Sequence, residues 1–243
     1  MRSPYPHDEL SESFVLRARH VTSNISVVLQ PVQRTLLRDS AYSVIRDAIV
    51  RGDILPGASV NNAELAQRLG LSRAPVRDAL ARLAAEGLVE TKPQSYTRVT
   101  LLVLRDVRDA AQVVRAMHEL AARTAVPRLT AEQVEVMRRA NRRFDAATRA
   151  GDVDAAMEAD DELHDVLVQA CGNLAVAATI GRYTPLIRRL ERQQFSQATA
   201  RRSVALHKRL IASCAAGDAD EATRVTAQIW SALVDLADDP ADR

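Results

Sequence analysis

Aromatic residues, cysteines and long apolar runs are all scarce in this chain, and each shortage excludes some classes of protein. Aromatic residues make up only 3%, while Ala, Leu, Val and Arg are abundant, which favours helices packed through small and aliphatic side chains. The two cysteines, Cys171 and Cys214, lie in apolar helical patterns without CxxC spacing, so we interpret them as buried thiols in a reducing cytoplasm. No apolar run reaches the about 18 residues of a membrane span, and the polar start does not resemble a signal peptide. We expect a mostly α, cytoplasmic protein with no membrane partner.

The positive charge of the chain is concentrated in one segment. The formal net charge is only +2 over 243 residues, but residues 31–100 hold 10 Arg and Lys against 7 Asp and Glu. A basic patch on one domain is typical of proteins that bind phosphate backbones. A chain of this length can form two modest domains, each with its own core.

The pattern of apolar residues and turn signals predicts where these domains lie. Residues 1–33 are polar and irregular and are expected to form an N-terminal extension. Residues 34–101 combine three helical segments, over 36–50, over 64–69 and after Ser72, with two β-prone runs at 88–90 and 97–100. Asn61 or Asn62 would cap the second helix and Ser72 the third. This order predicts a winged helix-turn-helix.

The remaining segment, 102–243, has a helical pattern throughout. Short links that contain Pro, Gly or Asn separate the predicted helices and imply antiparallel neighbours in an all-helical bundle. The expected helices are 104–126, 130–150, 152–171, 173–195, 197–216 and 218–237.

The run from Gly70 to Leu80 carries the DNA-binding prediction. Arg73 and Arg77 lie one turn apart at the start of a helix, so both project from the same face. A guanidinium binds guanine O6 and N7 in bidentate fashion, and a helix N-terminus attracts phosphate. The alternative is a solvated arginine pair on an ordinary surface helix.

Residues 36–100 resemble the DNA-binding domain of the GntR family of bacterial regulators. The resemblance covers the Leu-Pro-Gly turn at 55–57, Glu64-Leu65-Ala66 and the run from Gly70 to Leu80. It implies that Arg73 and Arg77 make the main DNA contacts and that Ser72 and Ala74 lie at the groove. It also implies a homodimer on a double-stranded, pseudo-palindromic operator.

Two positions depart from the family pattern. Ala63 stands where the family often has an arginine, and the wing reads Pro93-Gln94-Ser95 where a glycine is usual. The hairpin can still form if Gln94 takes an unusual turn geometry. Thr97 and Arg98 remain candidates for contacts with phosphate or the minor groove.

Residues 104–240 resemble the helical FCD-type ligand-binding domain of the FadR-like subgroup. The matching pieces are 115–119, 160–173 and 207–222. The resemblance implies a divalent metal, held by one Asp and three His, that helps to bind a small organic acid. Asp160, His164 and His207 match three ligands, whereas the fourth position is Ile229. Three protein ligands can still bind zinc, nickel or manganese, although less tightly.

Other charged or titratable residues of the bundle leave alternatives open. By the resemblance, Arg115 points into the pocket and pairs with the effector carboxylate, but it could equally pair with Glu119 one turn away. His118 is a substitute metal ligand, an effector contact, or a partly buried, hydrogen-bonded packing residue. We interpret the cluster of Arg188, Arg189 and Arg192 as a solvated face.

The sequence therefore favours a dimeric regulator, expected to be a repressor, that a small organic acid tunes on its operator. A metal-dependent enzyme built on Asp160, His164 and His207 is a weaker alternative, because no paired general base, nucleophile motif or phosphate loop accompanies them. A third hypothesis is a DNA-binding protein whose effector pocket has decayed, as Ile229 would suggest.

Overall fold

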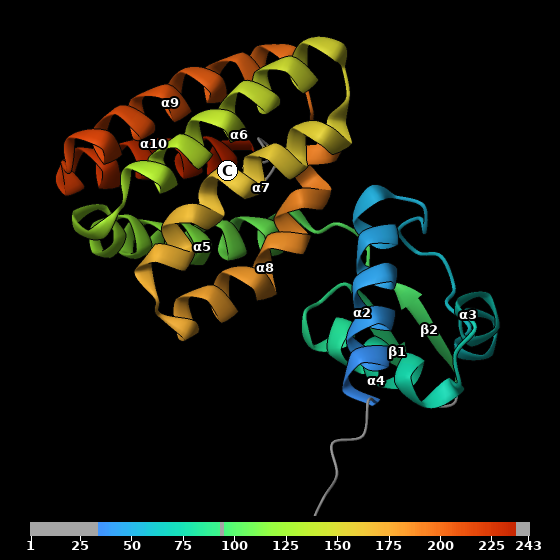
Figure 1. Ribbon diagram of the computed structural model, residues 1–243. Coiled ribbons are helices and arrows are strands. Elements are labelled where there is room, and N and C mark those ends of the chain that lie inside the picture. The colour runs from blue at the N-terminus through green and yellow to red at the C-terminus, as the bar shows by residue number, and fades with distance from the viewer. Residues whose placement is uncertain (1–33, 93–94, 237–243) are drawn as a thin grey trace, which may run out of the picture. The chain divides into compact units, whose positions relative to one another are not determined.

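The computed structural model describes residues 34–92 and 95–236 and is mostly helical, as predicted (Figure 1). The expected extension over 1–33 and the turn geometry expected at Gln94 lie outside the described residues. Among the helices that are described, none combines the length and apolarity needed to cross a bilayer.

The first part of the described chain has the element order of a winged helix-turn-helix. A two-stranded antiparallel hairpin follows three helices and has Val89 opposite Val99 and Lys92 opposite Tyr96. Thirteen buried residues from the helices and both strands form one core, with Val76, Leu83 and Leu88 fully inaccessible to solvent. The elements are α2 (Arg34–Arg51), α3 (Asn62–Leu69), α4 (Arg73–Ala85), β1 (Val89–Lys92) and β2 (Tyr96–Val99).

The turn between α3 and α4 follows from its capping residues. Asn61 caps α3, since its side chain accepts hydrogen bonds from the backbone N–H groups of Ala63 and Glu64. Gly70 ends α3 at φ 64°, a left-handed conformation that glycine adopts at little cost. Ser72 occupies the predicted N-cap position of α4, but the expected capping by its side chain is wrong. Its side chain makes no capping hydrogen bond within the described chain, and Pro75, at the third helical position, has no N–H to donate.

The wing is anchored by the segment that follows the Leu-Pro-Gly turn. The Val60 N–H donates to the Thr97 carbonyl at 2.8 Å, and the Val99 N–H donates to the Ala58 carbonyl at 3.0 Å. These bonds add a short third strand-like segment beside β2. The backbone of Thr97 is therefore held from the side opposite β1.

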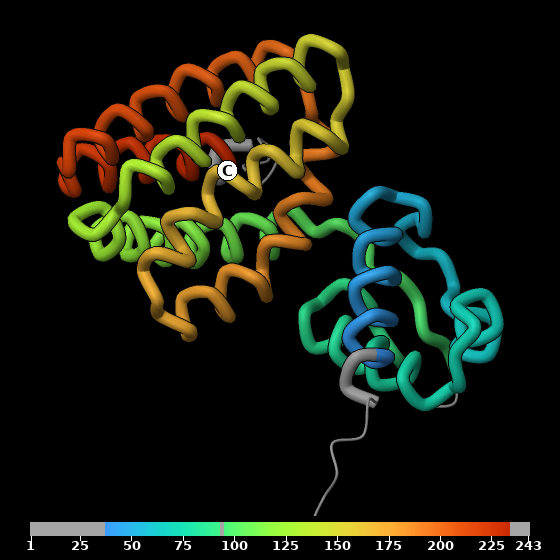
Figure 2. The backbone as a smooth tube through the Cα atoms, viewed as in Figure 1, coloured from blue at the N-terminus to red at the C-terminus, as the bar shows by residue number. Residues whose placement is uncertain are grey.

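The second part of the described chain is an all-helical bundle. Helix α5 packs against α7, α8 and α10, while α6 packs against α7 and α9; Figure 2 shows α6 and α9 lying side by side. The main buried cluster draws residues from each of the long helices, including Val114, Met137, Leu163, Ile187, Leu210 and Trp230. The bounds are α5 (Leu104–Ala125), the 3₁₀ turn η2 (Val126–Arg128), α6 (Ala131–Ala150), α7 (Val153–Cys171), α8 (Leu174–Gln193), α9 (Gln197–Ala216) and α10 (Ala219–Leu236).

The helix ends of the bundle lie within a few residues of the predicted positions because their caps are local. Thr130 and Gln133 form a reciprocal capping box at the start of α6. Only Gly151 and Asp152 separate α6 from α7: the glycine closes α6 at φ 74° and the aspartate caps α7. So short a link makes α6 and α7 antiparallel neighbours.

Candidate DNA-binding surface and candidate metal centre

The N-terminal end of α4 presents a polar, exposed face. Val76, Ala79, Leu80 and Leu83 point into the core, and this orientation leaves the other face of the helix to solvent. The four residues predicted to contact DNA here, Ser72, Arg73, Ala74 and Arg77, are all exposed.

Arg77 is free to move toward a ligand. Its side chain is 73% exposed, and its ion pair with Asp78 spans 3.9 Å between two exposed groups. Solvent screens such a pair almost completely. The guanidinium can therefore leave Asp78 at little cost in free energy.

The two predicted wing residues differ in how freely they can reach a ligand. Thr97 is half-buried, and its hydroxyl lies 3.3 Å from that of Thr91 on the neighbouring strand. Arg98 is exposed, donates a hydrogen bond to Glu90 and lies over the ring of Tyr96, 4.5 Å from its centroid. A phosphate that bound Arg98 would have to compete with the Glu90 carboxylate.

In the bundle, the structure brings together the three predicted metal ligands. One ligand atom from each of Asp160, His164 and His207 lies within 4.8 Å of the others. Asp160 Oδ1 is 3.3 Å from His207 Nε2 and 3.9 Å from His164 Nε2. Two atoms bound to one zinc ion at about 2.0–2.2 Å each lie roughly 3–3.5 Å apart, so at least the first pair has the spacing of a shared ion.

Hydrogen bonds from a second layer orient His207 toward this point. The amide nitrogen of Asn141 donates to the Val204 carbonyl at 3.4 Å, so the amide oxygen is left to accept from His207 Nδ1, 3.2 Å away. Nδ1 then carries the proton and Nε2 presents a lone pair. Outer hydrogen bonds of this kind fix the tautomer of metal-binding histidines.

His207 Nε2 is buried and has no hydrogen-bond partner among the described residues. Burial lowers the pKa of His207 to about 4, although the nearby Asp160 charge acts to raise it. The imidazole is therefore neutral near pH 7, and its lone pair faces a carboxylate oxygen. Two electron-rich atoms in this arrangement repel each other unless a cation lies between them, and the donor set thus fits a divalent metal.

Arg188 lies in this site, and the interpretation of Arg188, Arg189 and Arg192 as a solvated face is wrong. Arg188 is 8% exposed and Arg189 is 4% exposed. Arg188 donates to Asp160 Oδ2 at 2.7 Å, to Glu191 at 2.7 Å and to Asp161 at 3.1 Å. Its burial is possible because three carboxylates surround its charge.

The same cluster sets the charge states of the carboxyl groups. Burial would raise the pKa of Asp160, but the Arg188 charge and hydrogen bond, with His164 and His207, hold it well below its usual value. Burial raises the pKa of Glu191 to about 7, and the Arg188 charge offsets this rise only in part. Asp160 is therefore the group that stays charged and buried.

A cavity of about 90 Å³ opens beside the three candidate metal ligands. Asp160, His164, His207 and Arg188 form its polar side, and Phe144 and Ile229 are among its apolar walls. The position predicted to lack the fourth ligand thus lies at the cavity, where isoleucine offers only hydrocarbon.

Neither Arg115 nor His118, the two predicted effector residues, is among the described residues that line this cavity. Arg115 donates to Glu119 at 2.7 Å and to the Ser231 hydroxyl at 2.9 Å, which is the alternative that the sequence left open. His118 is 4% exposed and stacks on Trp230, with ring centroids 4.4 Å apart.

Sequence reasoning missed Asn141, Arg188 and Trp230. Asn141 had a detectable signal, because it falls in the apolar register of Val134, Met137 and Phe144 and interrupts it with a polar side chain. Arg188 had none, since its partner Asp160 is 28 positions away on another helix.

Comparison with known proteins agrees with this architecture. The pattern of the gntR family of bacterial regulatory proteins matches residues 37–99, and that of the FCD domain matches residues 108–232. An uncharacterized HTH-type transcriptional regulator in the TAR-I ttuE-ttuC′ intergenic region of Agrobacterium vitis is 35% identical over 135 residues, which cover 54% of this chain and 78% of that protein. The HTH-type transcriptional repressor RspR of Escherichia coli (strain K12) is 29% identical over 140 residues.

The RspR match spans 58% of this chain and 59% of that repressor, less than two thirds of its length. Among solved structures, E. coli McbR/YncC superposes with a TM-score of 0.73 at 18% identity, over 83% of this chain and 96% of that chain. An identity this low shows a shared fold alone. Together, the two matched domains show that the chain belongs to the GntR family, in the FadR-like subgroup with an FCD domain, and that it is a DNA-binding transcriptional regulator.

Proposed function

We propose that this regulator is a homodimeric repressor whose affinity for its operator changes when a small organic acid binds beside a divalent metal in the FCD domain. In this proposal residues 34–101 read DNA, and residues 102–243 bind the effector and form the dimer. One observation carries the metal-assisted part: the buried, unpartnered His207 Nε2 that faces Asp160 Oδ1 at 3.3 Å.

The DNA contacts are assigned to the exposed start of α4 and to the wing. Arg73 and Arg77 would contact base edges in the major groove of the DNA, with Ser72 and Ala74 also at this groove. The Ser72 hydroxyl supports this role, since it is exposed and is not used to cap the helix. In the wing, Thr97 and Arg98 would contact phosphate, with Arg98 exchanging Glu90 for the nucleic acid.

Asp160, His164 and His207 would hold the metal, with zinc, nickel and manganese as candidates. A bound ion would supply positive charge and open coordination positions for oxygen atoms of the effector. The chain contributes the orientation of these ligands: Arg188 holds one oxygen of Asp160, and Asn141 fixes the tautomer of His207.

The charge balance of the cavity explains why an acid would need the metal. Arg188 already donates to three carboxylates, so its charge is largely neutralised before an effector arrives. Without an ion, an incoming carboxylate would meet Asp160 and the partly ionised Glu191, and like charges at short range repel strongly. Arg115 supports the effector site less directly, because its side chain is held by Glu119 and Ser231.

The DNA assignment is tested by Arg73→Ala and Arg77→Ala in operator titrations at fixed salt. Each substitution should weaken specific binding by about 1–3 kcal/mol and relax base preference at one position. Arg142→Ala is the matched control, because it removes another exposed arginine, 64% accessible, from α6 of the bundle. Unchanged affinity and selectivity in both α4 variants would disprove the assignment.

The metal site is tested by metal content per protomer after purification without chelator. Near-stoichiometric metal should be found in the parent and lost in His164→Ala and His207→Ala. His118→Phe is the control: it keeps an aromatic ring against Trp230 and should retain the metal. If the parent stays metal-free after zinc, nickel or manganese is added, the decayed-pocket hypothesis replaces this proposal.

A further inference from the structure

Trp230 carries a buried hydrogen-bond donor that nothing in the described chain satisfies. The residue is 4% exposed, and its indole Nε1 has no partner among the described residues. Indole nitrogen can only donate, and a buried donor without an acceptor is costly in free energy. A native site that leaves such a group open calls for an acceptor from outside the described residues.

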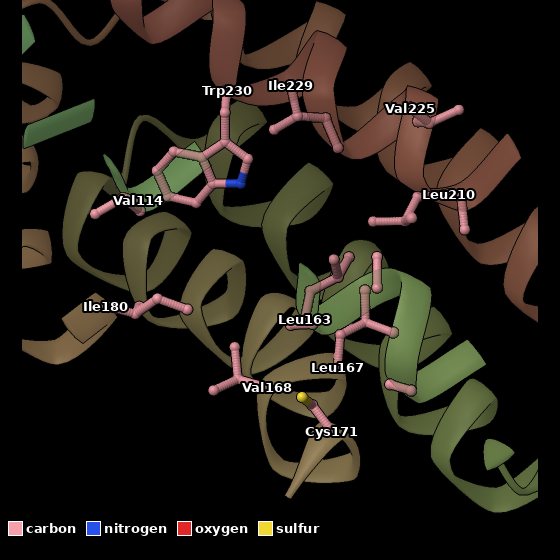
Figure 3. Packing of buried hydrophobic residues seen from close by; sticks show 14 of the residues in the cluster. Val114, Leu163, Leu167, Val168, Cys171, Ile180, Leu210, Val225, Ile229 and Trp230 are labelled. Atoms are coloured by element: carbon pink, nitrogen blue, oxygen red, sulfur yellow. The ribbon is translucent and has the colours of Figure 1, made fainter. Parts of the chain in front are cut away.

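The indole ring is held firmly in place. His118 stacks on its face at 4.4 Å with an interplanar angle of 16°, and His164 lies 5.9 Å away in a tilted arrangement. Figure 3 shows the nitrogen on the edge of the ring that points away from Val114 and Ile180. The donor therefore has a defined direction before any ligand binds, which lowers the entropic cost of using it.

Trp230 lines the same cavity as the metal ligands. His207 Nε2, the other unpartnered atom there, is an acceptor or ligand atom, whereas Trp230 Nε1 is a donor. The His164 ring is close to both residues, 5.2 Å from the His207 ring and 5.9 Å from the Trp230 ring. Both residues line the same small cavity, and their unpartnered atoms need partners of opposite kinds. His207 Nε2 needs a cation, and Trp230 Nε1 needs an oxygen acceptor.

The volume of the cavity limits the size of a ligand that could contact both the metal side and the Trp230 N–H. A buried water needs about 10–15 Å³ of such volume, so a cavity of about 90 Å³ has room for a ligand of only a few non-hydrogen atoms. Ile229 and Phe144 line part of it with hydrocarbon. A short carboxylate, with two oxygens and a small apolar tail, matches this combination of groups.

We propose that Trp230 is an effector-binding residue whose indole N–H donates to one oxygen of a short carboxylate, while the other oxygen lies on the metal side of the cavity. This inference rests on the proposed metal-assisted effector site. It places a fixed neutral donor in a cavity whose described lining has Arg188 as its only arginine or lysine, and carboxylates already bind that side chain. It also makes the tryptophan a selectivity element, because a ligand without an oxygen at that position would leave the donor unpaired.

Trp230 is the only tryptophan of the chain, so its fluorescence reports on the cavity without labels. The full-length protein is titrated with Zn²⁺ alone and then, loaded with Zn²⁺, with acetate as the probe. A hydrogen bond to the indole N–H should shift the emission to longer wavelength when acetate binds. Calorimetry on Trp230→Phe, which keeps a stacking ring and loses the donor, should show unchanged Zn²⁺ affinity and roughly tenfold or more weaker acetate binding.

Each alternative outcome has a distinct meaning. Equal acetate affinity in the parent and in Trp230→Phe, or binding with no change in parent emission, would overturn the role of Trp230 and leave the metal site standing. Zn²⁺ binding without any acetate binding would also overturn it and would indicate that a water molecule satisfies the indole. Failure of the parent to bind Zn²⁺, Ni²⁺ or Mn²⁺ would refute the metal-assisted part of the proposed function itself. If Trp230→Phe does not fold, the emission of the parent still decides the question.

Discussion

The buried ion pair between Arg188 and Asp160 allows a quantitative prediction for Arg188→Met. Methionine has nearly the same helix propensity and a similar length, so the substitution removes mainly charge and hydrogen bonds. It leaves Asp160 charged and buried, 14% exposed, without the cation that now lies 2.7 Å away. Breaking a buried pair in this way costs about 3–5 kcal/mol of unfolding free energy.

The other partners of Arg188 place the expected value in the lower part of that range. Asp161 is 50% exposed and can turn to water, and the pKa of Glu191, raised to about 7 by burial, lets this group become neutral near physiological pH. Asp160 alone bears the full penalty. We therefore expect a loss of about 3 kcal/mol for metal-free protein at neutral pH.

Urea unfolding followed by Trp230 fluorescence measures this loss within the bundle. With a slope of about 2 kcal/mol per molar, the midpoint should fall by about 1.5 M. Arg142→Met is the matched control: its ion pair with Glu135 is 64% and 42% exposed, so the change should stay below about 1 kcal/mol. Adding Asp160→Asn to Arg188→Met should restore part of the stability, because the orphaned charge is gone. A loss in Arg188→Met no larger than in the control would refute the reasoning.

Three further predictions concern stability and reactivity. Burial raises the pKa of Cys214 to about 12, so at pH 8 roughly one Cys214 thiol in ten thousand is ionised. Ellman's reagent should not label Cys214 until urea unfolds the chain, and it should not label Cys171 either, because that side chain is also buried. Leu163→Ala, at a site inaccessible to solvent, should cost about 2–5 kcal/mol, against less than about 0.5 kcal/mol for Leu174→Ala at 85% exposure. Thr130→Ala breaks the α6 capping box and should cost about 1 kcal/mol in the same urea assay.

The sequence alone determined where helices begin and end and how the DNA-binding segment is built. Asn61, Gly70 and Asp152 act on backbone groups within three or four residues, so their effects are encoded locally. The three candidate metal ligands could also be identified from the sequence: Asp160 and His164 are one helical turn apart, and the resemblance to the FCD domain supplied His207. Ser72 is the exception among these predicted caps: its hydroxyl makes no capping hydrogen bond within the described part of the chain. Pro75, at the third helical position, lacks one of the backbone N–H groups that such a cap can use.

Only the tertiary structure decided what each polar side chain of the bundle does. Arg188 looked like part of a solvated cluster, yet packing of α8 buries it against Asp160 from α7. Arg115 could reach either a ligand or Glu119, and the structure shows the pair with Glu119. The indole ring of Trp230 is held by stacking on His118, which comes from another helix. Helical periodicity tells which residues share a face, but the free energy of a buried polar group depends on the partners that other helices bring to it, and those partners are set by packing.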